Sequence, residues 1–143
     1  MIDPDETPTP ALGPCCTLAV SLAPETVIGT LATGGIRAYR AATGGTIEGS
    51  DLRGDIIGGG EMLLGRPDGV GVVEANYLLR TSGGGIIRLI GTGYATSDPP
   101  FIGTRMTVVF EVDEGGPIAH LSTRAYVAER SAGSDRYAIA EVL

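Results

Sequence analysis

The amino-acid sequence predicts an all-β fold, a single antiparallel, up-and-down β-barrel of about 8–10 strands. Apolar and polar residues alternate with a period of two along much of the chain, and no apolar stripe with a helical period competes with this pattern. Glycine accounts for 23 of the 143 residues and proline for 9, while 43% of the residues are hydrophobic. Such a chain is too apolar to be disordered and too rich in helix-breaking residues to be helical.

Strands are expected where the alternation is uninterrupted, in the segments 17–23, 26–31, 36–41, 46–48, 54–57, 62–66, 70–81, 85–96, 105–113, 118–129 and 137–142. The residues between them are typical of tight turns, as in Thr33-Gly34-Gly35 and Ser82-Gly83-Gly84. Short connections favour antiparallel neighbours. Closure of the sheet into a barrel would protect its edges, so a barrel is favoured over a flat sheet.

Glycine runs are expected to divide the middle of the chain into short strands. Gly44-Gly45 separates the segments 36–41 and 46–48, and Gly58-Gly59-Gly60 separates 54–57 from 62–66. Glycine loses more backbone entropy on folding than other residues, so these runs are expected to interrupt regular structure.

The segment 97–103 is expected to be a loop, because it contains Pro99 and Pro100 and breaks the alternation. It also carries Phe101. Loops over a barrel mouth often act as lids, but a plain connection fits the sequence equally well.

One domain is expected, with residues 1–15 as a flexible lead-in and residues 16–143 as the barrel. Residues 1–14 contain four prolines and three acidic residues and lack the features of a signal peptide. Cys15 and Cys16 are adjacent, which disfavours a disulfide of normal geometry between them. Free thiols, packed as small apolar residues, indicate a cytoplasmic protein.

The charge composition excludes several classes of function. The formal net charge is −7, and all ten basic residues are arginines, so no basic stripe for nucleic acid and no Schiff-base lysine are present. No segment has the roughly twenty apolar residues of a membrane span. Phosphate-loop and serine-nucleophile motifs are absent, and one histidine beside two adjacent cysteines does not make a zinc site. We therefore expect no cofactor and no metal.

Polar residues that interrupt apolar strands are the candidates for a site. We expect catalytic roles for Glu61, Glu74 and His120, because a carboxyl group inside an apolar barrel or a neutral imidazole can donate and move protons. Substrate-binding roles are expected for residues on the same strand faces, beside the glycine run or on the proline loop. These are Asn76, Met62, Tyr94, Arg88, Phe101, Ser122 and Tyr126.

Each candidate also has a structural interpretation, which the sequence leaves open. A strand residue faces solvent about as often as it faces the barrel interior. A lone histidine is more often structural than catalytic. The remaining strand and turn arginines are expected on the surface, and Tyr39 and Tyr77 are expected to pack with solvated hydroxyls. These arginines are Arg37, Arg40, Arg53, Arg66, Arg80, Arg130 and Arg136.

An ordered series of short motifs resembles one known family. The motifs are Gly44-Gly45-Thr46-Ile47-Glu48-Gly49, Leu52-Arg53-Gly54, Gly58-Gly59-Gly60-Glu61-Met62, Arg66-Pro67-Asp68-Gly69 and Glu74-Ala75-Asn76-Tyr77. In these motifs the chain resembles the domain of unknown function 3237 family of small bacterial and fungal β-barrel proteins, from about residue 17 to the end. The resemblance implies an antiparallel barrel, closed or nearly so, with a pocket.

The chain departs from the family pattern at three places. Glu61-Met62 stands where the family has an Asp-Trp pair, Glu74-Ala75-Asn76-Tyr77 where it has Asp-x-Arg-Tyr, and His120-Leu121-Ser122 where it has Trp-Leu-Asn. If these positions line the pocket, the departures imply a larger and less cationic cavity for a bulkier, less anionic ligand.

Three functions follow as hypotheses. By architecture the chain also looks like small β-barrel cyclases of polyketide biosynthesis, with a calycin-like or allene-oxide-cyclase-like barrel. That likeness implies a cofactor-independent cyclase or isomerase that folds a linear polyene in an apolar pocket, by [4+2] cycloaddition (a Diels–Alderase) or pyran formation. The alternatives are an acid–base isomerase or dehydratase that uses a pocket glutamate and histidine, and a non-catalytic barrel that binds an apolar small molecule. A homodimer is compatible with each.

Overall fold

Nine strands and one short 3₁₀ helix make up the fold in the computed structural model, which describes residues 7–143. The strands are β1 (Leu12–Leu22), β2 (Thr26–Thr30), β3 (Ile36–Gly49), β4 (Arg53–Gly65), β5 (Gly71–Thr81), β6 (Ile86–Thr96), β7 (Gly103–Glu111), β8 (Tyr126–Ser131) and β9 (Arg136–Val142), and the 3₁₀ helix is η1 (Ala119–Thr123). The expected lead-in, residues 1–15, begins outside the described residues, and β1 already starts at Leu12.

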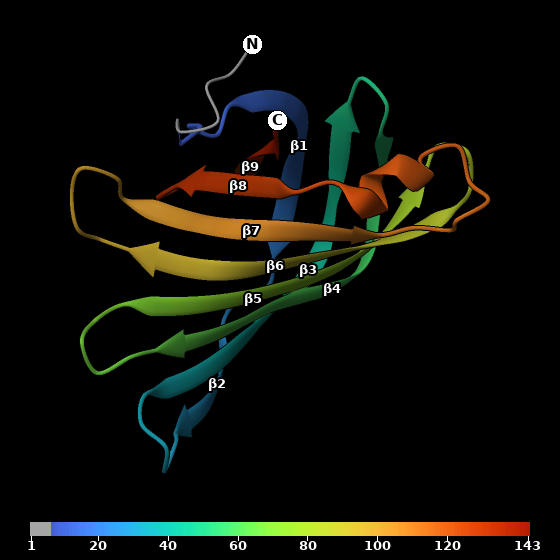
Figure 1. Cartoon of the computed structure of the whole chain (residues 1–143). Helices are drawn as coiled ribbons and strands as arrows, with labels where there is room; N and C mark the ends of the chain where they lie inside the picture. Colours follow the sequence, from blue (N-terminus) through green and yellow to red (C-terminus); the bar gives the residue numbers. More distant parts are fainter. Residues whose placement is uncertain (1–6) are drawn as a thin grey trace.

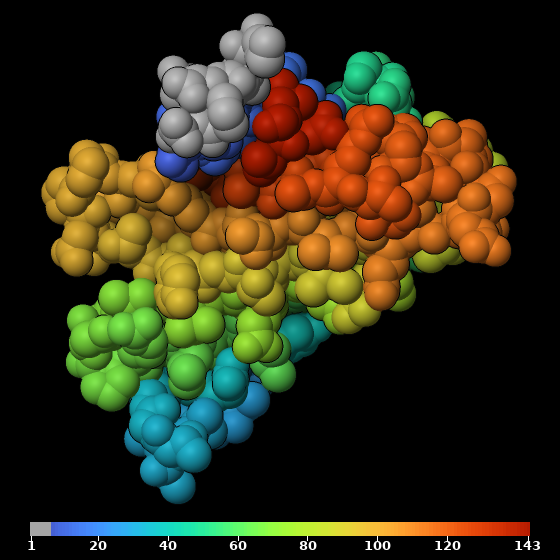
Figure 2. Space-filling view, in the orientation of Figure 1, coloured from blue at the N-terminus to red at the C-terminus, as the bar shows by residue number. Residues whose placement is uncertain are grey.

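Eight of these strands close into an antiparallel barrel (Figure 1). From β3 to β9 each strand pairs with the next one along the chain, and β1 closes the ring by pairing with both β9 and β3. Leu18, for example, lies opposite Ile47 of β3 and opposite Tyr137 of β9. The ninth strand, β2, extends β3 outside the barrel, and this part of the chain projects from the body of the molecule (Figure 2). The predicted fold class is confirmed.

The glycine runs bend strands and do not end them, so the expectation that they divide the middle of the chain is wrong. β3 and β4 are each continuous through their glycines. Gly45 and Gly59 have positive φ angles, and a Cβ atom at either position would overlap a backbone carbonyl oxygen of a neighbouring strand, at Ala19 and at Asn76. A register shift between Ile56 and Gly58 marks a bulge in β4, the strand that carries Gly59. Glycine is therefore used where backbones approach closely and the sheet curves into a barrel.

The segment 118–129 is not one strand, which corrects a second expectation. Its first part forms η1, and β8 begins only at Tyr126. The hydroxyls of Ser122 and Thr123 donate hydrogen bonds to the backbone carbonyls of Ala119 (2.8 Å) and His120 (3.2 Å). Such local bonds offer the backbone an alternative to a sheet ladder. His120 and Ser122 therefore do not share a strand face with Tyr126.

The inward-facing side chains become smaller from one end of the barrel to the other. Along β5 they run from Leu79 and Tyr77, both fully buried, through Ala75 and Val73 to Gly71. The end filled by large side chains also holds Phe110 and Tyr126, whose rings meet edge to face with centroids 5.1 Å apart. At the opposite end, which we call the mouth, inward positions carry Gly71, Ala95 and Thr104. Small side chains leave space there, so the barrel has a packed end and an open end.

Two other expectations concern the cysteines and the membrane. Cys15 is half-buried, Cys16 is buried in the core, and both are free thiols, as expected for cysteines that pack as small apolar residues. Their sulfur atoms lie 3.5 Å apart, beside a register shift between Pro14 and Cys16. Within residues 7–143, no helix is long and apolar enough to cross a membrane.

We expect Gly59→Ala to lower the free energy of unfolding by about 2 kcal/mol or more, because the new methyl group would overlap the Asn76 carbonyl at a φ angle that L-residues rarely adopt. Gly58→Ala is a matched control, since no atom lies within 4 Å of its Cβ position. There the change should be neutral or stabilise by up to about 1 kcal/mol. Urea unfolding followed by circular dichroism measures both variants, and equal destabilisation by the two would contradict this account.

Candidate functional site

A buried carboxylate lies at the centre of the barrel. Glu61 of β4 has no solvent-exposed surface, and it faces inward between Arg40 of β3 and Ala75 of β5. Its Oε2 atom accepts hydrogen bonds from the hydroxyls of Tyr77 (2.5 Å) and Tyr137 (2.9 Å). A carboxylate taken out of water needs such donors, because burial of an unpaired charge costs several kcal/mol, on the order of the whole stability of a domain.

Arg130 of β8 supplies the opposite charge. Its Nη2 atom lies 3.5 Å from Oε1 of Glu61, and only 13% of its side chain is exposed. The guanidinium carbon also lies 4.4 Å from the centre of the Tyr137 ring, a cation–π contact. Tyr137 therefore contacts both charged groups, and the four residues form one cluster that we call the Glu61 cluster: Glu61, Tyr77, Arg130 and Tyr137.

The two phenols of this cluster are held in their protonated form. Burial raises the pKa of Tyr77 well above its usual value, and the negative charge of Glu61 raises it further. The pKa of Tyr137 is raised for the same reasons, burial first and Glu61 second. Both hydroxyls are therefore protonated near neutral pH and donate their hydrogen bonds to Glu61.

The Arg130 guanidinium also reaches the cavity at the mouth. Among residues 7–143, its one hydrogen bond to a side chain is the bond to Glu61. No buried side-chain nitrogen or oxygen atom of these residues lacks a hydrogen-bond partner. The remaining guanidinium N–H groups must therefore be accessible, and Arg130 lines the mouth cavity. The arginine connects the buried carboxylate to the space where a ligand would bind.

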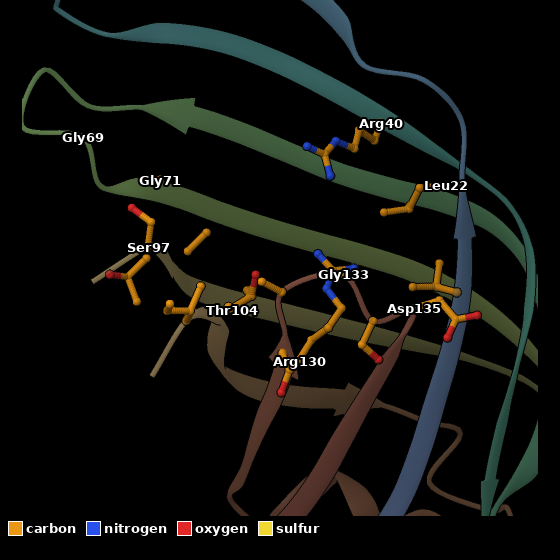
Figure 3. A pocket seen from close by; sticks show the side chains of 17 residues that line it. Leu22, Arg40, Gly69, Gly71, Ser97, Thr104, Arg130, Gly133 and Asp135 are labelled. Carbon is orange, nitrogen blue, oxygen red and sulfur yellow. The ribbon is translucent and has the colours of Figure 1, made fainter. Parts of the chain in front are cut away.

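The mouth cavity has two lobes. One lobe, of about 680 Å³, lies under the β6–β7 and β8–β9 loops and is lined by Ser97, Ser131 and Ser134 among others (Figure 3). The other, of about 390 Å³, lies along β3, β4 and β5, and its walls include Leu63 and Val73. Five residues line both lobes: Arg40, Gly71, Ala95, Thr104 and Arg130. Both arginines thus stand where the lobes meet, and each lobe has the size of a small-molecule site, commonly about 300–1,000 Å³.

Of the predicted catalytic residues, the structure places Glu61 alone in the interior. Glu74 is exposed on the outer face of β5, as is Asn76, because Val73, Ala75 and Tyr77 take the inward positions. The Asn76 side chain accepts a hydrogen bond from Arg88 (2.9 Å), which in turn pairs with Glu111. The expectation that Glu74 and Asn76 line the pocket is wrong, and Asn76, Arg88 and Glu111 form a polar network on the outer surface.

His120 lies at the packed end of the barrel, away from Glu61. Its Nε2 atom is 3.9 Å from Asp51, and it lines a cavity of only about 50 Å³ together with Cys15 and Tyr126. Ser122 is exposed on the same 3₁₀ helix, whereas Tyr126 is buried in the core. The structure therefore does not bring the predicted glutamate and histidine together.

The other predicted binding residues do not line the mouth cavity. Met62 and Tyr94 are exposed, Tyr94 by 56%, on the outer faces of β4 and β6. Phe101 is half-buried in the 97–102 loop, under the guanidinium of Arg105 at 4.0 Å. The loop itself does border the cavity, through Ser97 and Ile102.

Sequence reasoning missed the other members of the cluster and the second arginine. Arg130 was expected on the surface and Tyr77 with a solvated hydroxyl, but both are in the interior; Arg40 is partly exposed and also lines the mouth cavity. The alternation of inward and outward positions along each strand contains a signal that these side chains face inward. Arg130 follows Tyr126 and Ala128 at intervals of two, and Tyr77 continues the inward series of Val73 and Ala75.

Within residues 7–143, no three His, Cys, Asp or Glu side chains gather closely enough to hold a metal ion.

We expect Glu61→Gln to destabilise the protein by about 2–4 kcal/mol, because the amide leaves the buried Arg130 charge unpaired and turns an N–H group toward it. The matched control is Glu74→Gln, which changes an exposed glutamate on the outer face of the adjacent strand and should stay within about 0.5 kcal/mol of the wild type. Urea unfolding measures both. Equal destabilisation by the two variants would mean that Glu61 is not the buried partner of Tyr77, Tyr137 and Arg130.

The raised tyrosine pKa values predict a loss of stability at high pH. Below the ordinary tyrosine pKa of about 10, the phenols are protonated in both states and their contribution is complete. Above it, the unfolded chain releases these protons while the folded cluster retains them, so the free energy of unfolding should fall by about 1.4 kcal/mol per pH unit for each such phenol.

This pH dependence can be assigned to the cluster by comparing urea unfolding of the wild type with that of Tyr77→Phe from about pH 9 to 11. The slope above about pH 10 should be shallower in the variant by the contribution of one phenol. An unchanged slope would show that Tyr77 ionises equally readily in both states.

The comparisons with known proteins agree with this fold. The model of the family described as protein of unknown function (DUF3237) matches residues 10–142. Among curated proteins, no match to this chain is found. A protein of unknown function from Clostridium acetobutylicum ATCC 824 is 20% identical, with a TM-score of 0.84 over 94% of this chain and 100% of that chain.

Two further solved structures are similar over nearly their whole length. A β-barrel-like protein from Acinetobacter baumannii AYE is 25% identical, with a TM-score of 0.82 over 97% of this chain and 99% of that chain. A protein described as an enzyme from Penicillium herquei is 20% identical, with a TM-score of 0.79 over 96% of this chain and 98% of that chain. The motifs and the barrel lead to one assignment, and the chain belongs to the DUF3237 family of small β-barrel proteins.

Proposed function

We propose that this protein is a cofactor-independent cyclase or isomerase that binds a carbonyl-containing small molecule, such as a linear polyketide, in the mouth cavity. The observation that carries the proposal is Arg130, a largely buried guanidinium that a buried carboxylate holds in place while its other N–H groups face the cavity. Support also comes from the Penicillium herquei protein of similar fold, which is described as an enzyme. That support is an analogy of fold.

Arg130 would act on a substrate carbonyl. When a chain closes into a ring or a double bond shifts, electron density moves onto a conjugated carbonyl oxygen, and a guanidinium N–H group aimed at that oxygen stabilises the developing charge. Glu61 and Tyr137 fix the guanidinium, so it need not reorganise during the reaction. The cavity walls would hold the flexible chain in a reactive shape, which lowers the entropic part of the barrier. In this scheme Arg130 is the catalytic residue, and Glu61 and Tyr137 are positioning residues.

A non-catalytic binding barrel is the second candidate, and the burial of Glu61 favours it. The carboxylate has no exposed surface and does not line the mouth cavity, so it is poorly placed to take a proton from a bound ligand. The carboxylates that do border the cavity, Glu25 and Asp135, are at its rim. A barrel that binds and releases its ligand unchanged would need only the cavity and its arginines.

We expect the purified protein to convert at least one member of a panel of linear polyenes with terminal 1,3-dicarbonyl groups. Isomerisation and cycloaddition leave the mass of the substrate unchanged. A product is therefore recognised by a new retention time and ultraviolet spectrum at the substrate mass, which liquid chromatography with mass and ultraviolet detection measures. Arg130→Gln should lower kcat/KM by about 100-fold or more, as loss of one oxyanion donor does. Arg80→Gln, on the exposed face of β5, is the control.

Two outcomes would contradict the proposal. If the panel binds saturably and every ligand is recovered unchanged, the binding barrel is favoured. If turnover occurs but is lost in His120→Ala and kept in Arg130→Gln, the chemistry takes place at the packed end of the barrel.

A further inference from the structure

We propose that the mouth cavity selects amphipathic organic acids, and that the carboxylate or enolate oxygens of the ligand bind between Arg130 and Arg40. This inference deepens the proposed function and rests on the same cavity. The two arginines come from β8 and β3, on different sides of the barrel, and their side chains extend into one space (Figure 3). Guanidinium groups suit planar, two-oxygen anions, because their N–H donors match both oxygens of a carboxylate.

Arg130 has donors to give. Its bond to Glu61 uses one nitrogen at the long distance of 3.5 Å, and its other N–H groups are accessible from the cavity. Glu61 directs its second oxygen to two phenols, so the tyrosines share the task of stabilising that carboxylate. A ligand anion at the cavity side of Arg130 would therefore add a partner to the guanidinium without removing the buried one.

Arg40 can exchange its present partner for a ligand. It lies directly opposite Glu61 in the β3–β4 ladder, yet its guanidinium is turned away from that carboxylate and reaches Glu25, 3.3 Å away, near the rim. The two side chains of that pair are 37% and 42% exposed. Exposed ion pairs contribute little to stability, typically about 0–1 kcal/mol, so a ligand carboxylate competes with Glu25 at small cost.

Both arginines at the junction of the lobes are paired with a carboxylate, Arg130 with Glu61 and Arg40 with Glu25, so what they offer a ligand is their remaining N–H donors. Glu25 and Asp135 are the acids on the rim of the cavity, and Asp135 is 70% exposed beside Arg136. Water screens Asp135 more strongly than it screens Arg130, whose side chain is only 13% exposed, whereas Glu25 is about as exposed as its partner Arg40. Glu61 lies below the floor of the cavity, where its charge and that of Arg130 offset each other, and two tyrosine hydroxyls also donate hydrogen bonds to it.

The two lobes define the rest of the ligand. The lobe under the β6–β7 and β8–β9 loops has apolar walls, which include Val20, Leu22 and Ile102, with the hydroxyls of serines and Thr96 among them. Ile36, Leu63 and Val73 line the lobe along β3–β5, which suits an alkyl or polyene portion. With both arginines at the junction, the acidic oxygens bind there and the apolar portion of the ligand extends into the lobe along β3–β5. The bulkier, less anionic ligand expected from the sequence depended on positions 61–62, 74–77 and 120–122, of which none lines this cavity.

The test compares three probes of matched shape: 4-pentylbenzoate, 4-pentylbenzamide and 4-pentylbenzylamine. Isothermal titration calorimetry with the wild-type protein should show the acid binding at least about tenfold more tightly than the amide, and the amine more weakly still. Arg40→Gln and Arg130→Gln should each weaken acid binding by about tenfold or more and leave amide binding nearly unchanged. Arg80→Gln should alter neither.

Arg40→Gln keeps the test decisive, because this partly exposed side chain can be replaced without leaving Glu61 unpaired if Arg130→Gln fails to fold. Equal affinity for acid and amide, or an acid preference that survives in Arg40→Gln, would overturn the inference. The outcomes also separate it from the proposed function. Selective binding of the acid without conversion of any panel member refutes the enzyme and retains the acid site. Turnover of neutral substrates with no preference for the acid probe refutes the acid site and retains the enzyme.

Discussion

The rest of the structure depends on compensation of one buried charge. Glu61 stands on β4, and the groups that stabilise it come from β5, β8 and β9. In the order of the ring, β8 and β9 are separated from β4 by at least two strands on either side, so these contacts cross the lumen. An uncompensated carboxylate there would cost several kcal/mol, a large part of the stability of a domain of this size. The cluster thus constrains how the two halves of the barrel face each other.

That constraint also determines where the cavity lies. The Glu61 cluster occupies the middle of the lumen, with Leu79, Leu89 and Phe110 filling the end beyond it. On its other side the inward positions carry Gly71, Ala95 and Thr104, which cannot fill the space. Arg130 bridges the two regions, because one part of its guanidinium is bound by the cluster and the other faces the mouth. If the mouth cavity binds its ligand as proposed, stability and ligand recognition depend on the same side chain.

The sequence was sufficient for the fold but for only one residue of the cluster. Period-two alternation and turn chemistry predict the barrel, because burial of one strand face is a local property that the pattern records. Which face is inward depends on the register, and a shift by one residue exchanges the faces. Glu74 and Asn76 were therefore placed inside although the uninterrupted series Val73, Ala75, Tyr77 and Leu79 marks the inner face. Arg130 and Tyr137 meet Glu61 only through closure of the ring, which no local pattern records.

The choice between an apolar and an acid-binding pocket follows from these long-range contacts. Judged by composition, the barrel would enclose an apolar space, since 43% of the residues are hydrophobic and most charged side chains lie outside. Two arginines at the mouth change this, because a guanidinium that is already oriented and partly desolvated attracts an anion more strongly than one in water does. Glu61 is what allows Arg130 to remain in that position without a ligand. In the proposed acid site, the buried carboxylate is the support of Arg130 and acts on the ligand through the guanidinium it holds.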